Sequence, residues 1–83
     1  MPQTLIVVSA THDPEANVWW TSSGDMRGLL LEGATIEELR EMIPGAVLDL
    51  LEASGDTGPE REITVQIVAH TETRVQVPAA AAA

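Results

Sequence analysis

One amphipathic helix constrains this chain more than any other feature of its sequence. Thr35 followed by Glu38 forms a capping box, in which the threonine hydroxyl accepts from a first-turn N–H and the glutamate reaches back to the Thr35 N–H. Gly55 is a natural end point. Between these ends lies an apolar stripe at helical spacing: Ile36, Leu39, Ile43, Ala46, Val47 and Leu50. The rest of the chain must therefore supply the strands that this helix covers.

Pro44 interrupts the helical pattern. Proline has no N–H, and its ring crowds the carbonyl of Arg40 four residues back. We expect a kink at Pro44, or a break into two helices over 35–43 and 44–53. Leu48 falls on the polar side of a straight helix, so either the kink rotates it inward or it belongs to an interface. Acidic residues occupy the rest of the polar side: Glu37, Glu38, Glu41, Asp49 and Glu52.

Four segments read as strands, and together they predict a single α+β domain of order β-β-β-α-β over residues 1–78. The segments are 4–12, 18–23, 28–32 and 61–77. The first three form an antiparallel meander, and the fourth lies beside the first and parallel to it, because the other edge would need a longer crossover. The last segment is either one long strand or two with a bend near 70–72. It exceeds the usual strand length, so its far half is expected to project and to pair with another subunit. Residues 79–83, all alanine, are predicted to be a disordered C-terminal end.

Alternation along the strands assigns their faces. Ile6, Val8 and Ala10 share the core face of the first strand, and Ile63, Val65, Ile67 and Ala69 share that of the last. The adjacent tryptophans of the second strand must point in opposite directions. We expect Trp20 to face the helix and Trp19 to lie on the other face, where an indole would suit an interface. The alternative is that Trp19 only packs across strands.

Composition restricts the possible partners. The 83 residues include 13 acids, four arginines and no lysine, for a net charge of −9. Phosphates would be repelled, which argues against direct binding to nucleic acid or to an anionic membrane. The charge favours a basic protein partner or simply solubility. There is no cysteine, no signal-peptide pattern and no apolar run long enough to span a bilayer, so we expect a cytoplasmic protein.

No residue pattern predicts catalysis, a cofactor site or a metal site. A metal-dependent nuclease needs clustered carboxylates, but the first strand has none, and Asp13 lies beyond its end. His12 and His70 could meet if the outer strands pair, and with Asp13 or Glu72 they could bind zinc. Isolated histidines at strand ends are far more often ordinary surface residues. We therefore predict a protein that is not an enzyme.

Several short motifs resemble the HicB-like antitoxin family. They are Asp25-x-x-Gly28-Leu29, then Gly33-x-Thr35-x-Glu37-Glu38-Leu39. The segments around Asp13-Pro14-Glu15-Ala16, Met42-Ile43-Pro44 and Leu50 to Gly55 look closer to a small bacterial family of unknown function within that superfamily. The resemblance covers about residues 4–69. It implies a truncated ribonuclease-H-like fold that tends to dimerise and binds HicA, a small basic RNA-cleaving toxin. This chain departs from the family in having Arg27 before Gly28 and no DNA-binding segment after the last strand.

Three functions remain open after these observations. The first is a non-enzymatic module resembling a HicB-type antitoxin, which neutralises a small basic toxin. The second is a self-associating dimeric domain without a toxin, and the third is a small-ligand or metal binder near His12 and His70. The predicted partner or dimer interface consists of Trp19, Glu37, Glu38, Glu41, Leu48, His70, Val75 and Val77.

Overall fold

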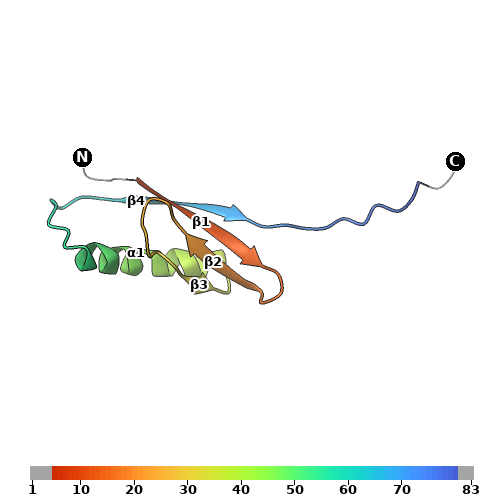
Figure 1. The fold of residues 1–83 in the computed structure, drawn as a ribbon, viewed down its shortest axis with the longest axis horizontal. Helices are drawn as coiled ribbons and strands as arrows, with labels where there is room; N and C mark the ends of the chain where they lie inside the picture. Colours follow the sequence, from red (N-terminus) through yellow and green to blue (C-terminus); the bar gives the residue numbers. More distant parts are fainter. Residues whose placement is uncertain (1–4, 81–83) are drawn as a thin grey trace.

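The computed structural model describes residues 5–80, which form one four-stranded sheet with a helix on one face (Figure 1). The elements are β1 (Leu5–Asp13), β2 (Val18–Ser22), β3 (Glu32–Gly33), α1 (Ile36–Ala53) and β4 (Thr64–His70). The strand order is β3-β2-β1-β4, with β1 antiparallel to β2 and parallel to β4. The predicted α+β layout is confirmed. Thr4, predicted to begin the first strand, and residues 81–83 of the predicted disordered end lie outside the described residues.

The core lies between the even-numbered side of β1 and the apolar stripe of α1. Ile6, Val8 and Ala10 are buried on this side of the strand. From the helix, Leu39, Ile43 and Val47 are buried against them. Ile63, Val65 and Ile67 pack at the margin of this cluster and remain half-buried, whereas Ala69 is exposed. The predicted core face is therefore confirmed for β1, and β4 forms its thinner edge.

The start of α1 follows the predicted capping box with one difference. The Glu38 N–H donates to Thr35 Oγ1 at 3.1 Å, as expected for an N-cap. The Glu38 carboxylate, however, accepts from the Ala34 N–H at 2.6 Å rather than from the Thr35 N–H. The helix then continues through Pro44 as one element of 18 residues. Of the two alternatives at Pro44, a kink or a break, the break is therefore wrong. The same apolar stripe packs on both sides of the proline and holds the two halves together.

The predicted third strand over 28–32 is also wrong in its extent. Only Glu32 and Gly33 pair with β2. The chain before them is held by Thr21, whose N–H donates to the Leu31 carbonyl at 3.0 Å. Its Oγ1 also donates to the Leu29 carbonyl at 3.0 Å and accepts from the Leu31 N–H at 2.9 Å. A buried threonine thus replaces part of a backbone ladder, which the apolar run in the sequence could not reveal.

Side chains from the loop after β2 complete the hydrogen bonding of β1. The Val7 N–H donates to Asp25 Oδ2, and Ser23 Oγ donates to the Val7 carbonyl, both at 2.7 Å. Gly28 then turns the chain with a positive φ of 92° and brings Leu29 into the core. A Cβ atom at Gly28 would stand 3.3 Å from Leu50 of the helix. This loop is therefore fixed to both the sheet and the helix.

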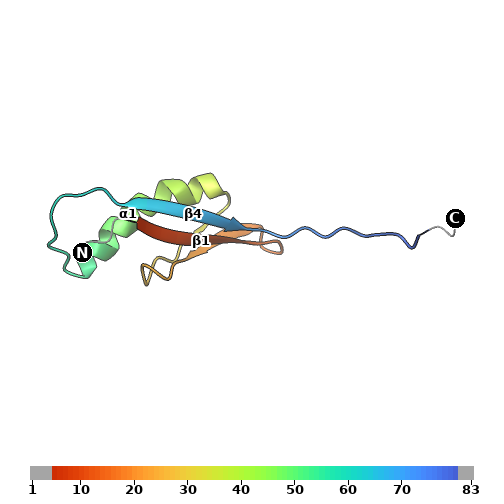
Figure 2. The same ribbon diagram turned by 90° about the horizontal axis from the view of Figure 1, so that it is seen from above.

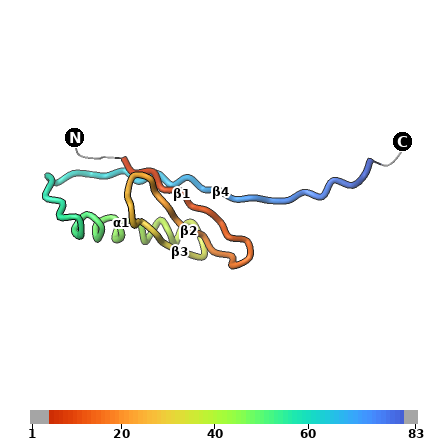
Figure 3. The backbone as a smooth tube through the Cα atoms, in the orientation of Figure 1, coloured from red at the N-terminus to blue at the C-terminus, as the bar shows by residue number. Residues whose placement is uncertain are grey.

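The last predicted strand is shorter than expected. β4 ends at His70, and residues 71–80 form no strand within the chain. They continue in the direction of β4 and run away from the sheet and helix (Figures 1 and 3). We call residues 71–78 the tail. Val75 and Val77 are 77% and 83% exposed on it, so the part predicted to project does project, but as unpaired chain.

The two tryptophans face the opposite way from the prediction. Trp20 is 41% exposed, whereas its neighbour Thr21 is 1% exposed on the helix side of the sheet. Trp19 shares that side and is half-buried, with its ring centroid 5.0 Å from that of His12. The reason is that Thr21 pairs with Ala10, whose side chain lies in the core. The buried Thr21 hydroxyl bonds to the loop at Leu29 and Leu31. With Thr21 on the helix side, alternation places Trp19 on that side and Trp20 on the other.

Candidate interaction surfaces

The two histidines do not form a site, although their strands pair as predicted. His70 pairs in register with Thr11, so it shares the Thr11 side of the sheet. His12, one residue further along β1, points to the other side, where its Nε2 lies 3.2 Å from Asn17 Oδ1. Residues 5–80 contain no group of three or more metal-ligating side chains that could hold an ion. The structure thus offers no support for the zinc hypothesis.

One ion pair shapes the turn between α1 and β4. Arg61 Nη2 lies 2.8 Å from Asp56 Oδ2, and both side chains are largely covered. The hydrogen bond from Arg61, followed by that from the Gly58 N–H, lowers the pKa of Asp56 below its ordinary value of 3.8. Each of these partners lies within the same turn. The Asp56 carboxylate therefore has a structural role, which is to hold the chain where it leaves the helix and approaches the sheet.

An open groove lies between α1 and β4. Its volume is about 560 Å³, and a smaller hollow adjoins it towards the start of the helix, lined by Arg40, Ile43 and Ile67 among others. The groove has an apolar floor, lined on the helix side by Pro44, Val47, Leu48 and Leu51 and on the strand side by Ile63 and Val65. The end of the helix and the turn after it complete the lining with Glu52, Asp56, Pro59, Glu60 and Arg61. We call the two hollows together the edge groove. Leu48, which sequence reasoning assigned to the core or an interface, is 66% exposed here.

The backbone edge beside this groove is unpaired within the described chain. β4 is the last strand of the sheet, with β1 on one side and no strand on the other. Figure 2 shows the first turns of α1 emerging beyond this edge, so that the helix forms a ledge beneath it. An exposed strand edge presents N–H and C=O groups that can pair with another strand. The edge groove therefore offers both backbone partners and an apolar floor.

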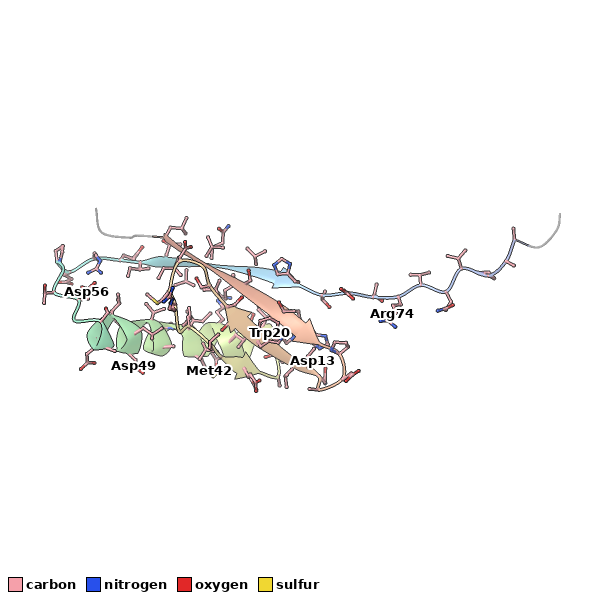
Figure 4. All side chains as sticks on the ribbon, in the orientation of Figure 1. Asp13, Trp20, Met42, Asp49, Asp56 and Arg74 are labelled. Carbon is pink, nitrogen blue, oxygen red and sulfur yellow. The ribbon has the colours of Figure 1, made fainter. Side chains whose placement is uncertain are left out.

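The face of the sheet opposite the helix is a second candidate surface. Among its exposed apolar side chains, Leu5 is 49%, Trp20 41% and Val68 39% exposed. These residues come from three neighbouring strands, with polar Ser9, Thr11 and Gln66 among them. No helix in residues 5–80 covers this face. Figure 4 shows Trp20 on β2 beside β1.

The outer side of α1 carries a row of carboxylates. Glu37, Glu41, Asp49 and Glu52 are all exposed there, and Asp49 points away from the sheet (Figure 4). We call these four residues the acidic row. Arg40 Nη1 lies 3.9 Å from Glu37 Oε2, and both side chains are more than 70% exposed. Solvent screens such an ion pair, so it contributes little to stability. Glu38 belongs to the cap of the helix rather than to this row, because its carboxylate is already bound to the backbone.

The predicted interface residues therefore do not share one surface. Glu37 and Glu41 belong to the acidic row, and Leu48 belongs to the edge groove. Val75 and Val77 lie on the tail, and His70 lies exposed just before it. Trp19 lies on the helix side beside His12, and the indole that is exposed on the open face is that of Trp20. Sequence reasoning missed the edge groove, because it depends on how far the helix lies from the β4 edge.

Comparison with known proteins places this geometry in a family. The model of the family described as "Domain of unknown function (DUF1902)" matches residues 5–79. The chain belongs to the DUF1902 family. A crystal structure similar to this DUF1902 domain is that of a hypothetical protein from the extremely thermophilic bacterium Thermus thermophilus. The two are 33% identical with a TM-score of 0.62, and the similarity covers 88% of this chain and 99% of that one. No curated protein matches the chain.

The motifs that resemble the HicB-like family have structural roles in this DUF1902 domain. Asp25 binds the β1 backbone, Gly28 supplies the positive φ, and Leu29 is buried. Thr35 and Glu38 cap the helix. These residues hold the fold together, so their spacing carries information about architecture. Among residues 5–80, no helix combines the length and the hydropathy of a bilayer-crossing segment.

Proposed function

We propose that this DUF1902 domain is a non-enzymatic protein-binding module that resembles a HicB-type antitoxin and neutralises a small basic RNA-cleaving toxin. The observation that carries the proposal is the acidic row, in which four exposed carboxylates follow one side of the only helix in the described residues. Lysine is absent from the whole chain, and the net charge is −9. Such a surface accelerates the approach of a basic protein and repels nucleic acid.

A pull-down from the native host, with the bound proteins identified by mass spectrometry, tests this proposal. One small basic protein in fixed stoichiometry is the expected result. The variant Glu41→Lys/Asp49→Lys reverses two charges of the acidic row and should weaken that complex at least tenfold. Glu15→Lys/Glu62→Lys changes the net charge by the same amount at exposed positions away from the row. Equal weakening by both variants would mean that only bulk charge matters, and no recovered basic partner would remove the antitoxin proposal.

A second function, self-association without a toxin, is favoured by a different observation. The tail leaves the body with Val75 and Val77 exposed at 77% and 83%, although both residues suit strands. A chain of 83 residues also has a thin core, and a dimer would add buried apolar area. The two functions are compatible, because the acidic row and the tail are separate surfaces. Light scattering on the full-length chain measures the oligomeric state directly.

A further inference from the structure

The edge groove has an apolar floor beside an unpaired strand edge, and the tail carries exposed valines on unpaired chain. We propose that the tail of each copy binds in the edge groove of a second copy. The tail of one copy pairs antiparallel with the free edge of β4 in a second copy, and the second copy returns its own tail in the same way. This inference rests on the self-association named above and is independent of any basic partner. It makes the groove incomplete in a single chain, because a second copy supplies Val75 and Val77.

The side-chain period of the tail fits the groove. Residues directly opposite one another in an antiparallel pair point to the same face, and faces alternate along an extended chain. Val65 and Ile67 of β4 face the helix and line the two hollows of the edge groove. The exposed valines of the tail are also at odd-numbered positions. A pairing that joins odd with odd therefore places both valines over the apolar floor formed by the helix.

Among the registers that keep this parity, one places both valines opposite residues of β4 that line the edge groove. If Thr71 lies on the two-fold axis, Val77 is opposite Val65 and Val75 is opposite Ile67. Glu72 of the second copy then lies opposite His70, which is a favourable neighbour for a carboxylate. A shift that places Glu72 on the axis would bring two carboxylates together, which is unfavourable across strands. In the chosen register Pro78, which cannot donate a backbone hydrogen bond, comes opposite the first residue of β4, where the ladder ends.

The tail has no means of pairing with its own β4. Folding back as a hairpin would require a tight turn after His70, and such turns depend on glycine, asparagine or aspartate. The sequence there is Thr71-Glu72-Thr73. Instead the tail continues straight away from the body in both views (Figures 1 and 2), and Arg74 lies on it beyond the sheet (Figure 4). A tail that pairs with the free edge of β4 therefore comes from another copy.

The acidity of the chain does not oppose this contact. Between residues 63 and 78 the only acid is Glu72 and the only arginine is Arg74, so their formal charges cancel. Of the other acids, Glu52, Asp56 and Glu60 line the edge groove, where Asp56 is paired with Arg61. Residues 73–78 of the tail carry no acid that would face them. Two copies can approach along β4 and the tail without bringing rows of like charges together.

Cysteine cross-linking tests the exchange and its register, because the natural chain contains no cysteine. In the proposed dimer Thr71 faces itself across the axis. Opposed residues in antiparallel pairs have Cα atoms about 4.5–5.5 Å apart, which suits a disulfide. The full-length variant Thr71→Cys should become a disulfide-linked dimer under mild oxidation. Ala79→Cys, on the same extended segment, lies opposite Ile63 instead and should remain largely unlinked. Equal linking of the two variants would reflect random collisions and would overturn the exchange.

Light scattering on two further variants separates the apolar contact from charge. The unmodified chain should have twice its mass of 8.8 kDa. Val75→Glu/Val77→Glu should raise the dimer dissociation constant at least tenfold. Arg74→Gln/Gln76→Glu lowers the net charge by the same amount on the opposite face of the tail and should leave the dimer intact. A dimer without the Thr71→Cys link would overturn the exchange but leave self-association standing, whereas a monomer would overturn both. The basic-partner proposal is decided separately, by the pull-down.

Discussion

Thr21 offers the sharpest test of how this fold is held together. Its side chain is 1% exposed, and its hydroxyl makes two hydrogen bonds to the segment before β3: it donates to the Leu29 carbonyl and accepts from the Leu31 N–H. Thr21→Val keeps the shape of the side chain and removes both bonds. Two backbone groups then lose their partners, each at a cost of about 1–3 kcal/mol. We expect the free energy of unfolding to fall by about 3 kcal/mol in total.

Urea unfolding followed by tryptophan fluorescence measures this loss. For a domain of this size the slope is about 1–1.5 kcal/mol per molar urea, so the midpoint should fall by roughly 2–3 M. Thr11→Val is the matched control, since the Thr11 hydroxyl forms no hydrogen bond within residues 5–80. All variants must be compared at one protein concentration, because the proposed dimerisation would make the midpoint concentration-dependent.

A second variant keeps the test informative if Thr21→Val fails to fold. Thr21→Ser loses a methyl group but retains the hydroxyl, so it should be the more stable of the two replacements. If Thr21→Val proves as stable as Thr11→Val, or more stable than Thr21→Ser, the hydroxyl does not hold the segment before β3.

Three further predictions concern the turns and the helix start. Thr35→Ala removes the N-cap bond to the Glu38 N–H and should lower the free energy of unfolding by about 1 kcal/mol, measured by urea titration. Gly28→Ala forces a side chain into a φ of 92° and against Leu50, and should lower the melting temperature measured by circular dichroism, with a cost of about 1–3 kcal/mol. NMR titration should show that the pKa of the Asp56 carboxyl lies below 3.8. Because this pKa is lower in the folded than in the unfolded state, the carboxylate stabilises the fold above pH 3.8. That contribution is lost as the pH falls through the folded-state pKa. The variant Arg61→Gln should bring that pKa back towards its ordinary value, and an unchanged titration would contradict the assigned cause.

The candidate surfaces were predictable to different degrees. The acids of the helix could be read directly, because a solvent-facing side of an amphipathic helix follows from its apolar stripe. The projection of Val75 and Val77 could be predicted, because they prolong an alternating pattern beyond the length of an ordinary strand. The edge groove could not be predicted from the sequence, because its width depends on how α1 is placed relative to β4. The prediction that Trp20 faces the helix was wrong. Alternation shows which residues of a strand share a face, but it does not show which of the two faces is buried.

Local sequence patterns were enough to assign the order of elements, the start of the helix and the core faces of β1 and α1. These depend on local spacing, on one capping box and on the period of the apolar residues, which are properties of neighbouring positions. The phase of β2, the shortness of β3 and the continuity of α1 through Pro44 depend on tertiary contacts. In each case a contact between distant residues outweighed a local preference: Thr21 with Leu29 and Leu31, or the helix stripe with the sheet. Where the chain meets no distant partner, as in the tail, residues with strand preference remain unpaired.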